Sequence, residues 1–202
     1  MVPLLAKVVG GGDLTGREAA AAFGHIVSGE ASQIQTGALL AALQTKGLAP
    51  SEVAGGVEAL REAMVPVRAP GRDDLVDTCG TGGGGVSTFN ISTAAALVVA
   101  AGGVRVAKHG NRSFTSKCGS ADVLEALGVV VQLTPEAMAA VLAEAGIVFM
   151  FAPLLHPAMR HVVPVRRELG VTTIMNLLGP LTNPAGARRQ VVGVADPACL
   201  EL

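Results

Sequence analysis

After residue 73 the sequence repeats one pattern, in which a short apolar run is followed by a loop and a helical segment. Apolar runs with the length and composition of buried strands occupy residues 75–79, 104–108, 147–151 and 190–195. Segments that favour helices occupy residues 90–102, 121–128, 134–146 and 157–169. This alternation specifies an α/β domain with a largely parallel sheet, whose ligands bind beyond the carboxyl ends of the strands.

The residues before this region lack the alternation and predict helices instead. Thr15 and Glu18 have the spacing of a capping box, and Ser32 and Gln35 repeat it. In such a box each side chain satisfies a backbone N–H that the first helical turn leaves unpaired, so each pair marks a helix start. A third helix follows Pro50, where apolar residues recur at helical intervals.

A segment rich in proline and charged residues separates the two regions and indicates a linker. We expect a helical domain over residues 1–72 and an α/β domain over residues 73–202. The sequence ends soon after the last predicted strand, and a parallel sheet that stopped there would lack its last crossovers. We therefore expect a fragment of a longer chain or a truncated homologue, with an α/β domain truncated at its C-terminus.

Composition limits the classes of partner. The formal net charge is -1, aromatic residues make up 2% of the chain, and Trp and Tyr are absent. A chain of this kind has neither a basic field nor aromatic platforms for nucleic acid. Three widely spaced cysteines, Cys79, Cys118 and Cys199, fit no disulfide or zinc framework, which favours a cytoplasmic location. We expect no signal peptide, no membrane span and no membrane partner.

The run CGTGGGGVSTFNIST, residues 79–93, holds five glycines in its first seven residues. Glycine lets successive backbone amides point at one anion, and the helix expected to begin near Asn90 adds its own unpaired amides and a positive dipole end. Hydroxyl groups for phosphate oxygens follow in the same run. The pattern matches neither a P-loop nor a dinucleotide fingerprint. It predicts a phosphate site, with a flexible surface loop as the alternative.

A second polar loop, KHGNRSFTSKCGS, follows the next predicted strand. Between residues 75 and 121 the only acid is Asp77, against four basic residues, Arg105, Lys108, Arg112 and Lys117. We therefore expect an excess of positive charge that holds a doubly phosphorylated substrate. Another helix start follows Ser120, so two helix starts and two polar loops are predicted to meet in one place.

Together these blocks resemble a known family. CGTGG, NIST, VAKHGNRS, GSADVLEALG, HPAMRHVVPVRRELG and NLLGPLTNPA occur in the order found in anthranilate phosphoribosyltransferases, over residues 75–194. The resemblance implies an α/β domain of the nucleoside phosphorylase/phosphoribosyltransferase type. It also implies an enzyme of tryptophan biosynthesis that transfers phosphoribose from 5-phosphoribosyl diphosphate (PRPP) to the amino group of anthranilate. The products are N-(5-phosphoribosyl)anthranilate and diphosphate, Mg2+ is the cofactor, and a homodimer is expected.

The same resemblance assigns site residues. It implies that PRPP is bound by Gly80, Gly83, Gly84, Thr88, Asn90, Ile91, Ser92, Thr93, Lys108, His109, Gly110, Asn111, Arg112, Ser113, Phe114, Thr115, Ser116 and Ser120. Anthranilate is assigned to Gly80, Asn111 and Arg166, magnesium to Ser92, and the catalytic roles to Lys108, Asn111 and Arg166. Two departures stand out. Many members have Asp where this chain has Gly84, and the family's acidic pair that completes magnesium binding lies beyond Leu202, so we expect little turnover from these residues alone.

Several residues keep a structural alternative. His109 and His156 either fill space or touch substrate, and the residues themselves leave both open. Arg160, His161 and Arg167 are expected on an exposed helical face, and Cys79 and Cys118 as small buried side chains. Two other functions remain for the whole chain, a pyrimidine nucleoside phosphorylase-like enzyme and a non-catalytic homologue that binds nucleic acid.

Overall fold

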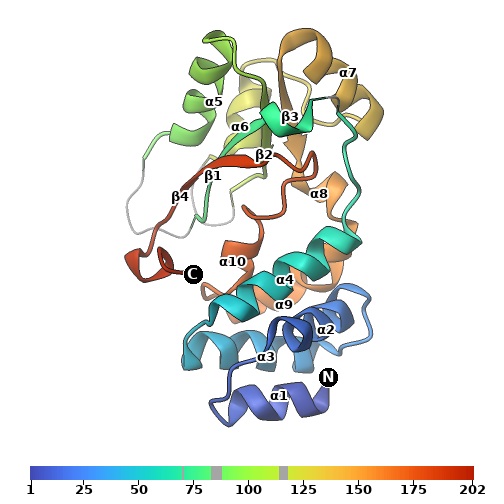
Figure 1. Cartoon of the computed structure of the whole chain (residues 1–202), viewed down its shortest axis with the longest axis vertical. Coiled ribbons are helices and arrows are strands. Elements are labelled where there is room, and N and C mark those ends of the chain that lie inside the picture. The colour runs from blue at the N-terminus through green and yellow to red at the C-terminus, as the bar shows by residue number, and fades with distance from the viewer. Residues whose placement is uncertain (70, 83–87, 114–117) are drawn as a thin grey trace. The chain divides into compact units, whose positions relative to one another are not determined.

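The computed structural model describes residues 1–69, 71–82, 88–113 and 118–202. Within these ranges four strands form one parallel sheet in the order β3-β2-β1-β4 (Figure 1). The strands are β1 (Val76–Gly80), β2 (Val106–Gly110), β3 (Ile147–Phe151) and β4 (Arg189–Gly193). The parallel sheet predicted from the alternation of strands and helices is confirmed.

Strand β2 begins two residues later than the apolar run 104–108 predicts. Gly103, with a φ of 85°, turns the chain out of the preceding helix, and the Val104 N–H donates to the Val99 carbonyl at 3.3 Å. Val104 is held in this turn and is 40% exposed. Sheet pairing therefore starts at Val106, opposite Val76 of β1.

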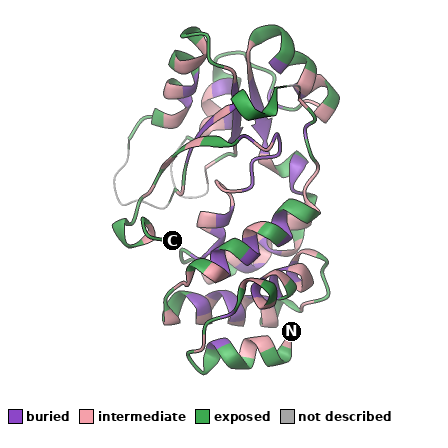
Figure 2. Cartoon of the chain, viewed as in Figure 1, coloured by how far each residue is buried: buried purple, intermediate pink, exposed green. Residues whose placement is uncertain are grey.

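Helices cover the sheet. Helix α5 (Ile91–Ala101) packs against β1 and β2, and α7 (Pro135–Ala145) packs against β3. The N-cap Thr134 accepts a hydrogen bond from the Ala137 N–H at 3.2 Å. The shorter helices here are α6 (Ser120–Ala126) and α8 (Ala152–Leu155). In Figure 2 the first three strands are mostly buried, whereas β4 alternates between exposed and half-buried residues.

The remaining helices form a unit of their own. They are α1 (Val2–Val9), α2 (Gly16–Val27), α3 (Gln33–Lys46), α4 (Pro50–Ala63), α9 (Val163–Leu169) and α10 (Met175–Leu178). A short 3-10 turn at Pro157–His161 belongs to the same unit, and two others lie at Arg72–Asp74 and Pro197–Cys199. Both predicted capping boxes are confirmed, at the starts of α2 and α3. Among the described residues, no helix has the length and apolar character that crossing a membrane requires.

The two compact units are not continuous stretches of sequence. The helical unit comprises residues 1–64, 156–182 and 198–202, and the α/β unit comprises residues 65–155 and 183–197. Residues 156–182 join the helical unit because their apolar side chains, among them Val162, Ile174 and Leu178, are buried in its core. This grouping differs from the linear division at residue 72, which stays a prediction.

Helices α2 and α4 approach closely through glycine. A Cβ atom at Gly55 would collide with the Gly16 carbonyl and the Ala19 side chain. A Cβ atom at Gly56 would lie 2.7 Å from Leu178 Cδ1. The absence of side chains at these two positions lets α2 and α10 pack directly on the α4 backbone.

Glu52, which is fully buried, joins three parts of the helical unit. Its Oε1 accepts from the Leu14 N–H at 3.0 Å, and its Oε2 accepts from the Ala49 N–H at 2.9 Å and from Lys46 Nζ at 3.1 Å. The carboxylate thus caps α4 and ties it to the end of α3 and to the segment that leads into α2. A buried charge is tolerated in such a place because every oxygen has a donor.

We expect Glu52→Gln to lower the free energy of unfolding by about 3 kcal/mol, because the new amide NH2 would face N–H donors and Lys46 would lose its buried partner. Urea denaturation followed by circular dichroism measures this loss. The matched control is Glu58→Gln on the same helix, where the side chain is exposed and the change should be close to zero. Equal stability of the two variants would contradict the role given to Glu52.

Candidate functional site

The two segments predicted to hold phosphate leave neighbouring strands at the same edge of the sheet. β1 ends at Gly80 and β2 ends at Gly110, and the two strands are adjacent. Five of the predicted PRPP ligands, Gly83, Gly84, Phe114, Thr115 and Ser116, lie outside the described residues. The others are described and can be placed.

The beginnings of α5 and α6 lie side by side. Asn90 Nδ2 donates to the Cys118 carbonyl at 3.1 Å, and Thr93 Oγ1 donates to Ser120 Oγ at 2.9 Å. In the described structure the Asn90 side chain makes no capping bond to its own helix, because it reaches across to the second segment instead. The convergence that the sequence predicts is therefore present, with the positive end of the α5 dipole at its centre.

Lys108 is buried beneath this place, with 3% of its surface exposed. Its Nζ donates to the Thr78 carbonyl at 2.6 Å and to Ser92 Oγ at 3.1 Å. Burial lowers the pKa of Lys108, while the nearby Asp77 carboxylate raises it. An ammonium group has three N–H donors, and these two contacts use two of them. Lys108 thus joins β1 to the first turn of α5 and adds positive charge under it.

Asp77 has a structural role that the sequence does not reveal. Its carboxylate is fully buried on β1 and accepts from the His109 N–H at 3.1 Å, from Asn183 Nδ2 at 2.8 Å and from Gln190 Nε2 at 3.0 Å. Burial raises the pKa of Asp77, and the three hydrogen bonds and the charge of Lys108 lower it. The signal available in the sequence is a single acid inside an apolar strand, a position where a carboxylate needs several donors.

The expected excess of positive charge is smaller than the sequence count suggests. Arg112 donates to Asp122 Oδ1 at 2.8 Å and to both carboxylate oxygens of Glu125, at 2.6 and 2.8 Å. These bonds raise the pKa of Arg112, and its guanidinium lies 5.6 Å from the centre of the Phe151 ring. The count ended one residue before Asp122, so it missed two acids that α6 places beside Arg112. Arg112 is paired in this structure, which corrects the electrostatic expectation.

The remaining predicted ligands in the α/β unit differ in exposure. Gly80, Thr88, Ile91 and Asn111 are exposed at the strand ends and at the start of α5. Asn111 closes a small turn, since its Oδ1 accepts from the Arg112 N–H at 2.7 Å and its carbonyl accepts from the Ala121 N–H at 3.3 Å. Half-buried positions are Ser92, Gly110, Ser113 and Ser120, whereas Thr93 and His109 are buried.

Arg166 belongs to the helical unit. It lies half-buried on α9, its Nη2 donates to Asn176 Oδ1 at 3.1 Å, and burial lowers its pKa. His156 is buried in the same unit, where desolvation lowers its pKa to about 4. As predicted, Arg160 and Arg167 are exposed, whereas His161 is half-buried, contrary to the prediction. The hydrogen bond to Asn176 thus holds the Arg166 side chain to its own unit.

The described residues provide few ligands for a magnesium ion. They contain no group of three or more His, Cys, Asp or Glu side chains that could hold a metal ion. Ser92 Oγ, the predicted ligand, accepts a hydrogen bond from the Lys108 ammonium, and the nearby Asp77 carboxylate is occupied by three donors. Because Mg2+ requires several oxygen ligands, this donor set alone does not fit it.

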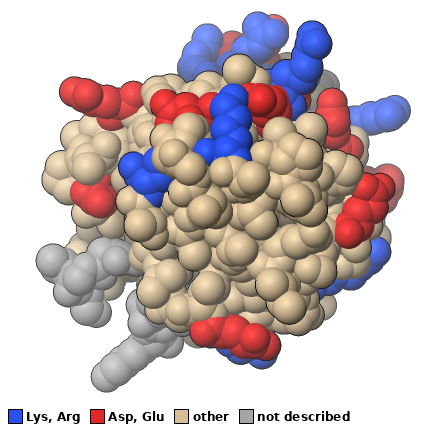
Figure 3. Space-filling view, turned by 90° about the horizontal axis from the view of Figure 1, so that it is seen from below, with Lys and Arg blue, Asp and Glu red and all other residues tan. Residues whose placement is uncertain are grey.

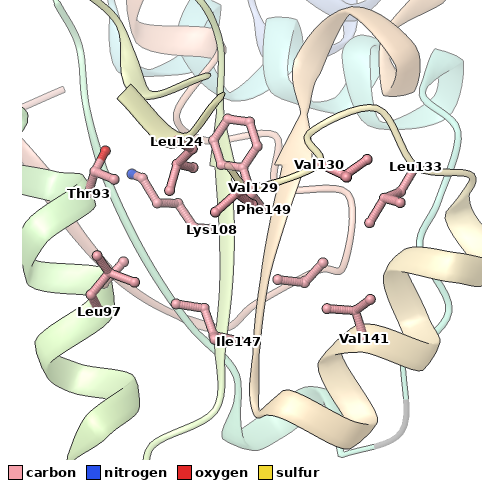
Figure 4. A pocket seen from close by; sticks show the side chains of 12 residues that line it. Thr93, Leu97, Lys108, Leu124, Val129, Val130, Leu133, Val141, Ile147 and Phe149 are labelled. Carbon is pink, nitrogen blue, oxygen red and sulfur yellow. The ribbon is translucent and has the colours of Figure 1, made fainter. Parts of the chain in front are cut away.

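An apolar pocket of about 150 Å3 lies on the sheet between α5 and α7 (Figure 4). Its lining includes Leu97, Leu124, Val130, Val141 and Phe149, and its two polar members among the described residues are Thr93 and Lys108. A phosphate group requires several hydrogen-bond donors, which this lining lacks. The helix starts described above fit an anion better than the pocket does.

Charged side chains on the face seen in Figure 3 are mixed in sign, with basic and acidic groups close to one another. The described residues on this face form no basic stripe of the kind that follows a nucleic-acid backbone.

Comparison with known families agrees with this geometry. The model described as "Glycosyl transferase family, a/b domain" matches residues 72–202, and the model described as "Glycosyl transferase family, helical bundle domain" matches residues 2–64. The chain belongs to the glycosyl transferase family. The combination of a helical domain with a parallel-sheet α/β domain, predicted from the sequence, is thereby confirmed.

Individual members of the glycosyl transferase family are similar to most of the chain. The anthranilate phosphoribosyltransferase of Afipia carboxidovorans is 54% identical over 191 residues, which are 95% of this chain and 56% of that protein. The crystal structure of anthranilate phosphoribosyltransferase from Thermus thermophilus matches with a TM-score of 0.93 and 50% identity, over 98% of this chain and 60% of that one. The enzyme from Saccharomyces cerevisiae in complex with PRPP and Mg matches with a TM-score of 0.88 and 26% identity, over 98% and 59%.

The resemblance that the sequence blocks indicate is confirmed by these relatives, and they favour it over the nucleoside phosphorylase-like and nucleic-acid-binding alternatives. The chain spans between 56% and 60% of the length of these three relatives.

The cysteines give a direct test of the site geometry. Cys79 is buried on β1 as predicted, and burial raises the pKa of its thiol to about 12, whereas Cys118 is exposed, contrary to the prediction that it is buried. Cys118 belongs to the second polar segment, between the end of β2 and the start of α6.

We expect iodoacetamide to alkylate Cys118 rapidly and Cys79 hardly at all near pH 8, because only about one Cys79 thiol in ten thousand would be ionised there. Mass spectrometry of the digested protein locates the label. Both cysteines should react in denaturant, which is the control. Rapid labelling of Cys79 in the native protein would contradict its burial on β1.

Proposed function

We propose that this chain binds PRPP at the adjoining starts of α5 and α6 and that it belongs to an enzyme that transfers phosphoribose to anthranilate. The observation that carries the proposal is the meeting of the two polar segments at the ends of β1 and β2, through the Asn90–Cys118 and Thr93–Ser120 hydrogen bonds. The names of the relatives support this substrate class, and the structure of the yeast relative is a complex with PRPP and Mg.

In the proposed reaction the bond between the anomeric carbon of ribose and a diphosphate oxygen breaks. Diphosphate leaves with the electron pair, the anthranilate nitrogen bonds to the anomeric carbon, and this nitrogen then loses a proton. Positive charge develops on the ribose and negative charge on the leaving group. The chain would stabilise the leaving group with the first amides of α5 and with the positive charge of Lys108 beneath them. An aromatic amine is neutral near pH 7, so the step needs no strong base.

Anthranilate is proposed to be bound through its carboxylate. The Arg166 guanidinium can form a two-pronged hydrogen bond with a carboxylate, which a lysine cannot reproduce. A guanidinium has five N–H donors, so the bond to Asn176, which fixes its orientation, is compatible with a carboxylate ligand as well. Gly80 and Asn111, the other predicted anthranilate contacts, stay predictions.

The proposal also includes Mg2+ as the cofactor, a cytoplasmic location and a homodimer. The ion is suggested by the yeast relative, and Ser92 is the predicted ligand among the described residues. A cytoplasmic location is supported by the small number of cysteines. A homodimer is supported by the apolar character of the helical segment at the start of the chain.

We expect Lys108→Met to weaken PRPP binding about tenfold while anthranilate binding changes little, because the variant removes positive charge beneath α5 at nearly constant volume. Arg166→Met should do the reverse. Isothermal titration calorimetry of each substrate with the full chain measures both. Arg167→Met is the matched control, since its exposed side chain is one residue along α9 from Arg166. Equal effects of Lys108→Met and Arg166→Met on both substrates would contradict these roles.

A further inference from the structure

Strands β1 and β2 pair for a shorter distance than the other neighbours in the sheet. They share the single register pair Val76 and Val106, whereas β1 and β4 share five pairs and β2 and β3 share five. The backbone hydrogen-bond ladder between β1 and β2 is therefore interrupted toward their carboxyl ends, between the two segments to which PRPP binding is assigned. We call this place the β1–β2 seam.

Where the β1–β2 ladder is interrupted, side chains form hydrogen bonds with the backbone groups that the two strands would otherwise pair. If the ladder continued from Val76, the Thr78 carbonyl would accept from the His109 N–H, and the Ala107 carbonyl would accept from the Thr78 N–H. Instead, the Thr78 carbonyl accepts from Lys108 Nζ at 2.6 Å, and the His109 N–H donates to Asp77 Oδ1 at 3.1 Å. The Ala107 carbonyl accepts from Asn183 Nδ2 at 2.9 Å.

Asn183 differs from Lys108 and Asp77 because it comes from outside both strands. It is 3% exposed, and its Nδ2 donates to the Ala107 carbonyl of β2 and, at 2.8 Å, to Asp77 Oδ2 of β1. Its Oδ1 accepts from the Ala185 N–H at 3.0 Å, which fixes the orientation of the amide. One buried amide thus spans the seam with both of its N–H donors.

We propose that Asn183 is a positioning residue for PRPP, which keeps the carboxyl ends of β1 and β2 apart by the distance that the substrate requires between the two binding segments. The inference rests on the proposed function. Without the Asn183 amide, the Ala107 carbonyl and the Asp77 carboxylate would lose their shared donor. The least costly way to satisfy the backbone would then be to pair β1 and β2 directly, which would move the two segments closer together.

A merely structural role predicts something different. In that case the loss of Asn183 would lower stability and would weaken all ligands of the folded protein alike. A positioning role predicts a selective effect, because PRPP contacts both segments, whereas inorganic phosphate needs only one of them.

The test compares Asn183→Leu with Gln190→Leu in the full chain, under conditions where circular dichroism shows both variants folded. Gln190 is the matched control because it donates to the same Asp77 Oδ2, at 3.0 Å, but from β4, and so does not span the seam. We expect Asn183→Leu to weaken PRPP binding at least about tenfold and phosphate binding less than about twofold. Gln190→Leu should leave both affinities within about twofold.

Asn183→Ser provides a second variant if Asn183→Leu does not fold, because its hydroxyl is too short to reach both strands. Amide hydrogen exchange at His109 adds a readout that needs no ligand, and its protection should change in the Asn183 variants but not in Gln190→Leu. Unchanged PRPP affinity in both Asn183 variants, or equal losses for PRPP and phosphate, would overturn the inference. Failure of the unaltered chain to bind PRPP would instead contradict the proposed function itself.

Discussion

The buried carboxylate of Asp77 is the interaction on which the α/β unit depends. It accepts from the His109 N–H on β2, from Gln190 on β4 and from Asn183, and so ties β1 to both neighbouring strands. Removing a carboxylate from water is costly, and it is tolerated here because three donors and the charge of Lys108 replace the lost hydration. A carboxylate with these partners fixes the relative positions of the strand ends that begin the site.

The positions of the strand ends determine where the two polar segments begin. The two polar segments begin at Gly80 and Gly110, and the hydrogen bond from Thr93 to Ser120 joins the two helices that follow them. Lys108 supports the first turn of α5 from below through Ser92. The proposed anion site thus consists mostly of backbone amides and helix starts, above buried side-chain hydrogen bonds.

Much of this fold can be predicted from the sequence, because its signals are local. Capping boxes at Thr15 and Ser32 and the alternation of strands and helices need no knowledge of distant contacts. What could not be predicted depends on tertiary contacts. The donors around Asp77 come from other strands and from residue 183, and the acids beside Arg112 lie on the next helix. Likewise, residues 156–182 join the helical unit through apolar contacts with residues far away in the sequence, which local patterns do not predict.

We propose that a doubly phosphorylated sugar binds at the joined starts of α5 and α6. Titration of the isotope-labelled chain with PRPP, followed through its backbone amide NMR signals, locates the binding site. We expect the largest shifts at Gly80, at Asn90 to Thr93, at Gly110 to Ser113 and at Ser120. Shifts centred on the apolar pocket, at Val130 and Val141, or spread evenly over the chain would contradict it.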